Sequence, residues 1–116
     1  MIYNLDKINE MADGDEDFIT SVISVFLEEV PVDLETMESA IQNKDYETVY
    51  QMAHKIKPNV DLLGMEQTRA TALEIETLGK SEEISEVNSE EIATKFPLLK
   101  QDVNQVISEL KKDFNL

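Results

Sequence analysis

Apolar side chains recur every three or four positions through most of this chain, which is the spacing of one face of an α-helix. The longest such run extends from about Asp15 to Gln42 and contains Pro31, which we expect to kink or locally break the helix. Its apolar positions are Ile19, Ile23, Phe26, Val30, Leu34, Met37 and Ile41. A short helix, capped near Asn4 or Asp6 and ended by Gly14, is predicted ahead of it.

Two shorter helices are predicted next. One runs from Tyr46 to about Leu63, with Asp45 as its N-cap and Gly64 as its stop. Its apolar stripe consists of Val49, Met52, Ala53, Ile56, Val60 and Leu63. The other lies within residues 65–80 and ends at Gly79, and its predicted inward positions are Ala70, Leu73 and Leu78.

A last long helix is predicted after an acidic segment, residues 81–91, that we interpret as a loop containing at most one helical turn. Asn88 is the predicted N-cap of this helix, and Glu91 completes a capping box. Pro97 is expected to bend the helix early, and its apolar positions are Ile92, Phe96, Leu99, Val103, Val106 or Ile107, Leu110 and Phe114. The pattern predicts an all-α fold: an antiparallel four-helix bundle with a short additional N-terminal helix, forming a single domain over residues 1–116.

Composition and charge narrow the possible functions. The chain has 116 residues, of which 41% are apolar, enough for one folded core. Its 25 acidic and 10 basic side chains give a net charge of −15, which repels nucleic acid and anionic lipid, so we expect no binding to either. No run approaches the roughly 18 apolar residues of a membrane span, and no cysteine is present. The absence of cysteine suits a reducing cytoplasm, where we expect the protein to be. We also expect a monomer, because four helices already close their own core.

The only histidine, His54, lies in the run QMAHKIKPNVDLLGM. On a helical wheel it falls roughly 150° from the centre of the apolar stripe, at Ile56, and therefore faces water. Tyr50, Lys57 and Asp61 lie within about 70° of it on the same wheel. The histidine is thus predicted to be a surface residue with lysines beside it.

Several kinds of chemistry do not fit this histidine. A di-iron bundle needs Glu-x-x-His on its inner face, whereas position 51 is Gln and His54 faces outward. A zinc site needs more His or Cys than this chain has, and the run DGDED lacks the ligand pattern of a calcium loop, so no metal site is predicted. No nucleophile elbow and no glycine-rich phosphate loop is present.

Two interpretations of His54 stay open on the residues alone. It is either an ordinary surface residue or a nucleophile towards a phosphoryl group. An imidazole in water beside ammonium groups can attack phosphorus, and Lys55 and Lys57 would then offset the charge of the product.

The segment AHKIKPNVDLLG resembles the motif of histidine-containing phosphotransfer (HPt) domains. In that family a small residue precedes the phosphoacceptor histidine, an aliphatic residue and a lysine follow it, and glycines usually stand four and ten positions later. The matching residues here are Ala53, His54, Ile56, Lys57 and Gly64. The order of the helices up to His54 is also similar to the family, whereas the residues after about position 81 match only as a helix pattern.

The resemblance implies a phosphorelay intermediate of two-component signal transduction. His54 would accept a phosphoryl group from an aspartyl phosphate on one receiver domain and pass it to another, with Lys57 neutralising charge. The partners would be receiver domains of response regulators or hybrid histidine kinases. The chain would be a phosphocarrier and not an enzyme, with no cofactor of its own, because the receiver supplies Mg²⁺. The residues expected to contact the partner are Tyr50, Lys55, Pro58, Asp61 and Leu62.

One residue departs from the family motif. Pro58 stands where the family usually has glycine, and a proline inside a helix removes one hydrogen bond and typically costs ~3 kcal/mol or more. The alternative function is therefore an inactive HPt-like module that docks a receiver domain without phosphotransfer. A third hypothesis, an acidic helical bundle unrelated to signalling, rests on the net charge alone.

Overall fold

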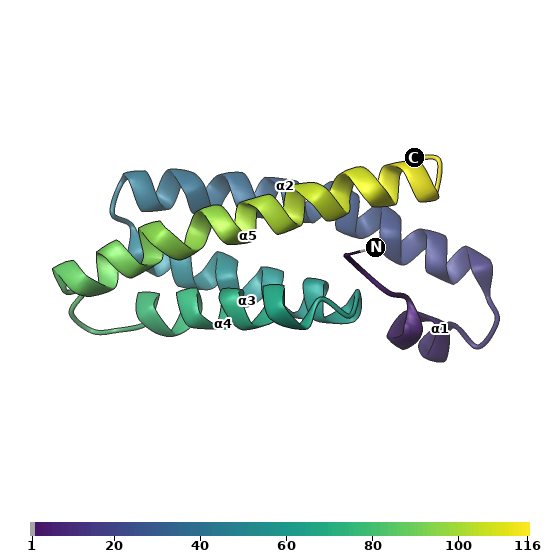
Figure 1. Cartoon of the computed structure of the whole chain (residues 1–116), viewed down its shortest axis with the longest axis horizontal. Coiled ribbons are helices and arrows are strands. Elements are labelled where there is room, and N and C mark those ends of the chain that lie inside the picture. The colour runs from purple at the N-terminus through teal and green to yellow at the C-terminus, as the bar shows by residue number, and fades with distance from the viewer. Residues whose placement is uncertain (1) are drawn as a thin grey trace.

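The computed structural model describes residues 2–116, which form five α-helices and no strand (Figure 1). The helices are α1 (Asp6–Ala12), α2 (Glu16–Gln42), α3 (Tyr46–Leu62), α4 (Glu66–Gly79) and α5 (Glu86–Asp113). Helices α2 to α5 alternate in direction, with α3 packed between α2 and α4, and α5 packed against both α4 and α2. The predicted antiparallel four-helix bundle with a short additional N-terminal helix is confirmed.

The apolar stripes predicted for α2, α3 and α5 form the core. Their most buried members include Ile23, Val30, Met37, Val49, Ile56, Val60, Ile92, Leu99, Val103 and Leu110. Side-chain caps begin three of the helices: Asp15 for α2, Asp45 for α3 and Ser85 for α5. Such caps satisfy backbone N–H groups that have no partner inside the helix.

Two sequence predictions about the second half of the chain were wrong. The last helix begins at Glu86, because Ser85 accepts the N–H of Asn88 and so takes the capping role predicted for Asn88. Leu73 is 40% exposed and does not face inward. The buried face of α4 is instead made of Thr68, Ala72, Ile75, Glu76 and Gly79.

Three helices continue through an internal proline. Pro31, Pro58 and Pro97 lie inside α2, α3 and α5, and each of these helices is unbroken on both sides of its proline. The local break considered at Pro31 does not occur. Packing of the neighbouring apolar turns into the core stabilises the helix across each missing hydrogen bond.

The segment before α1 and the first turn of α1 pack against the end of α3 and the turn that follows it. The N–H of Asn4 donates to the carbonyl of Leu63 at 2.8 Å, and Lys7 Nζ lies 2.9 Å from Asp61 Oδ1. Gly64 has a φ of +69°, and the Asn4 side chain occupies the space that a Cβ at this position would need. A glycine is therefore required here for two reasons, the left-handed backbone and the close approach of Asn4.

Candidate functional site

His54 lies on the outer surface of α3, as predicted. Its side chain is 67% exposed, whereas Ala53 and Ile56 on either side of it are fully buried. The burial of these two neighbours fixes the rotation of the helix and therefore directs the imidazole to the surface. The prediction that His54 faces water is confirmed.

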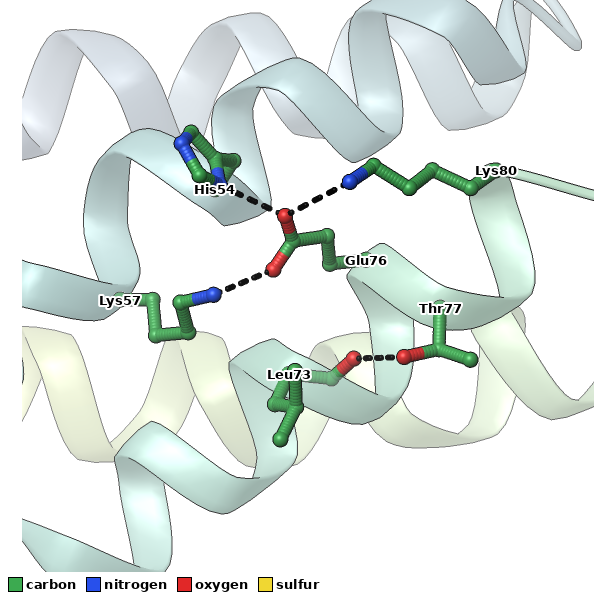
Figure 2. Close-up of polar contacts among 6 residues, drawn as sticks. All are labelled: His54, Lys57, Leu73, Glu76, Thr77 and Lys80. Carbon is green, nitrogen blue, oxygen red and sulfur yellow. Dashed lines mark hydrogen bonds and ion pairs between the residues drawn. The ribbon is translucent and has the colours of Figure 1, made fainter.

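A carboxylate from the next helix holds the imidazole in place. Glu76 of α4 is only 5% exposed, and its Oε2 lies 2.6 Å from His54 Nδ1 (Figure 2). Its other oxygen, Oε1, accepts a hydrogen bond of 2.7 Å from Lys57 Nζ. Lys80 Nζ approaches Oε2 at 3.5 Å from the other side. One buried carboxylate thus brings together three side chains from α3 and the end of α4.

The charge state of Glu76 sets the tautomer of the histidine. Burial alone would raise the pKa of Glu76. The hydrogen bonds from Lys57 and His54, together with the positive charge of Lys57, outweigh burial and lower that pKa below its ordinary value. Glu76 is therefore ionised at neutral pH and can only accept hydrogen bonds. His54 Nδ1 must then carry the proton, which leaves the lone pair of a neutral imidazole on Nε2.

Close contact between α3 and α4 makes this geometry possible. A Cβ on Gly79 would lie 3.0 Å from Tyr50 Cβ and 3.3 Å from the carbonyl oxygen of Tyr46. Only glycine lets the end of α4 come this near to α3 without displacement. Lys80 follows directly, and its Nζ lies 5.8 Å from the centre of the Tyr50 ring.

The other residues predicted for the site point in different directions. Lys55 Nζ pairs with Asp33 Oδ1 of α2 at 3.0 Å, on the side of α3 that faces α2. Asp61 is engaged by Lys7 and by Arg69, at 2.9 and 3.7 Å. Neither joins the cluster around Glu76.

Three more predicted residues lie on α3 itself, and among the described residues none of them hydrogen-bonds to the imidazole. Pro58 is exposed one turn after His54, Tyr50 is half-buried one turn before it, and Leu62 is partly buried against the core. Their contact with a partner stays a prediction.

Sequence reasoning missed Glu76, Lys80 and Asp33. A local signal existed for two of them, because Glu76 falls on the apolar face of α4 and Asp33 adjoins Leu34 on the apolar face of α2. A carboxylate at such a position is rarely buried without a partner, and this could have prompted a search for cations on the facing helix. The Oδ2 of Asp33 is buried and has no hydrogen-bond partner among the described residues.

The fold and this site define a small helical bundle that presents one anchored histidine on its surface. The family model for the Hpt domain matches residues 21–109, and the chain therefore belongs to the Hpt family. Neither the curated proteins nor the solved structures gave a match. Membership in this family assigns the chain to histidine phosphotransfer in two-component signalling, as a phosphocarrier module that interacts with receiver domains and not as an enzyme. None of the helices in residues 2–116 has the length and apolar character needed to span a membrane.

Proposed function

We propose that this chain is a phosphorelay intermediate in which His54 accepts a phosphoryl group from an aspartyl phosphate of one receiver domain and passes it to a second. The observation that carries the proposal is the hydrogen bond from His54 Nδ1 to Glu76 Oε2 at 2.6 Å. It holds the proton on one ring nitrogen and leaves the other, Nε2, as an unprotonated nucleophile on an exposed ring.

The transfer step needs no base from this chain. The Nε2 lone pair forms a bond to phosphorus as the bond between phosphorus and the aspartyl oxygen breaks, and the receiver recovers its carboxylate. The ring keeps its Nδ1 proton and becomes a positively charged phosphoimidazolium. The Glu76 carboxylate beside Nδ1 offsets this new charge, and the reverse steps return the phosphoryl group to a second receiver.

Charge and position are the contributions that phosphoryl transfer requires, because little covalent chemistry is left to the protein. Lys57 adds positive charge near the ring, and a Mg²⁺ ion bound by the partner receiver would neutralise the phosphoryl oxygens. In this proposal the chain has no cofactor of its own and works as a monomer in the cytoplasm.

The alternative is an Hpt-like module that docks a receiver without accepting phosphate, and it rests on Pro58. The unbroken α3 and the intact contact between His54 and Glu76 favour the active form, because a decayed site has no need of a buried carboxylate aimed at the imidazole. The family match disfavours a bundle unrelated to signalling.

Intact-protein mass spectrometry tests the proposal. Wild type and His54→Gln are mixed with Mg²⁺ and a panel of receiver domains phosphorylated by a small-molecule donor. We expect one phosphate on the wild type alone, labile in acid and stable in base. If wild type gains no phosphate from any receiver but still binds one of them, the docking module is the better description.

A further inference from the structure

Lys80 immediately follows α4 and lies beside the imidazole without belonging to the histidine helix. It reaches this place because Gly79 brings the end of α4 against Tyr50. Its Nζ approaches the same Glu76 oxygen that accepts from His54, and Figure 2 shows Lys57 and Lys80 approaching that carboxylate from opposite sides. The Glu76 carboxylate beside the imidazole therefore holds two ammonium groups, one from α3 and one from the residue that follows α4.

The two lysines are held differently. Lys57 is 25% exposed and donates a 2.7 Å hydrogen bond to Oε1 of Glu76. Lys80 is 57% exposed, and its 3.5 Å contact is with Oε2, which already accepts from His54. A buried carboxylate needs one close cation, and Lys57 supplies it. Lys80 is then a positive charge in excess of what Glu76 requires.

Lys55, which directly follows His54 in the sequence, is not an excess positive charge of this kind. Lys55 is bound to Asp33 on the α2 side, and the Asp33 pairing raises the pKa of Lys55, first through the hydrogen bond and then through the opposite charge. Releasing Lys55 would leave a buried Asp33 without its cation. Breaking the ion pair of Lys80 costs less free energy, because that pair is long and the Lys80 side chain is mostly in water.

We propose that Lys80 is a phosphoryl-binding residue: once a phosphoryl group is on Nε2 of His54, Lys80 leaves Glu76 and pairs with the phosphoryl oxygens. Lys57 stays with Glu76 and keeps the buried carboxylate neutralised. This inference rests on the proposed function, and it assigns the mobile counter-charge to a residue outside the histidine helix. The Tyr50 ring provides a surface on which the displaced ammonium group remains close to the site.

The experiment compares wild type with Lys80→Gln, Lys80→Arg and Lys100→Gln. The last is the matched control, because Lys100 is also a half-exposed lysine in an ion pair across two helices, here with Glu38. It removes the same charge from a different place. Each protein is loaded on histidine with phosphoramidate, which needs no receiver, and the phosphorus resonance is followed by NMR as a function of pH.

We expect the phosphoryl group of Lys80→Gln to change from dianion to monoanion at a higher pH than in wild type, because a nearby ammonium group stabilises the dianion. Lys80→Arg and Lys100→Gln should titrate like wild type. Transfer from a phosphorylated receiver should be about three- to tenfold slower in Lys80→Gln, which is the range of one exposed charge-assisted contact.

The outcomes separate the two proposals. Identical titration curves for wild type, Lys80→Gln and Lys100→Gln would overturn the role of Lys80 and leave phosphotransfer intact. A shifted curve for Lys80→Gln together with no transfer from any receiver would support the contact and overturn the relay. Thermal melts of the four proteins exclude unfolding as a cause, since an exposed lysine contributes little to the free energy of unfolding.

Discussion

Replacing Glu76 by Gln should reverse the tautomer of His54 and so disable the nucleophile. The substitution keeps the shape of the side chain and changes one acceptor oxygen into an NH₂ group. Lys57 donates and cannot accept, so it requires the remaining oxygen on its side. The NH₂ group then faces His54 Nδ1, which must present a lone pair and carry its proton on Nε2 instead.

The size of the effect follows from the geometry. The contact between Nδ1 and Oε2 is 2.6 Å long and the carboxylate is 5% exposed, so it is a short, shielded, charge-assisted hydrogen bond. Such a bond contributes about 1.5–3 kcal/mol, and forming the reactive tautomer in the variant would lose it. At 1.36 kcal/mol for each factor of ten, phosphotransfer should slow by about 10- to 160-fold.

Two measurements check this prediction. The ¹⁵N shifts of the imidazole distinguish the tautomers, and they should show the proton on Nδ1 in wild type and on Nε2 in Glu76→Gln. The second measurement is the rate at which each protein takes up phosphate from a phosphorylated receiver. Glu74→Gln is the matched control, since Glu74 lies on the same helix, is exposed and pairs with Lys95, away from His54.

A rate for Glu76→Gln within twofold of wild type would refute the argument, provided that the control also behaves like wild type. An unchanged tautomer with a slow rate would refute it in a different way. Glu76 would then act through its charge on the developing imidazolium and not through the position of the proton.

Three further perturbations have defined outcomes. Lys57→Gln should lower the free energy of unfolding in urea by about 1–3 kcal/mol, because the buried Glu76 loses its close cation. Burial, followed by the hydrogen bond to Asp113, raises the pKa of Tyr3 from 10.0 to about 12. The neutral Tyr3 hydroxyl therefore contributes fully to the free energy of unfolding below pH 10, and this contribution is lost as the pH rises through 12. Chemical denaturation should show this loss in wild type and not in Tyr3→Phe. Gly79→Ala should lower the melting temperature despite the better helix propensity of alanine, because the added Cβ would meet α3 at 3.0 Å; a higher melting temperature would contradict the close approach.

The helices and the exposure of His54 could be predicted from the sequence because both depend on local periodicity. A stripe of apolar residues determines where a helix lies and which way its other face points. The same logic failed for α4, where Leu73 points outward and the small residues Ala72 and Gly79 are buried, Gly79 against α3. Small residues allow two helices to approach closely, and hydrophobicity alone does not reveal this.

The contact between His54 and Glu76 could not be derived from periodicity. It depends on how far α4 is shifted along α3, which the turn at Gly64 and the packing at Gly79 determine. The start of α5 was equally ambiguous, because Ser85 and Asn88 are both good capping residues only three positions apart. The structure decides between them through the extended backbone of Ser85.

The anchoring of the N-terminal segment also bears on how the chain could be rearranged. Tyr3 donates to Asp113 at 2.5 Å and the N–H of Ile2 to Glu109 at 3.4 Å, so the start of the described chain lies beside the end of α5 (Figure 1). A short linker could therefore join the two ends, with new termini opened between α2 and α3. Such a circular permutant would keep every helix whole and α3 uninterrupted around His54. The order in which the helices are synthesised is thus separable from the arrangement that holds the histidine at the surface.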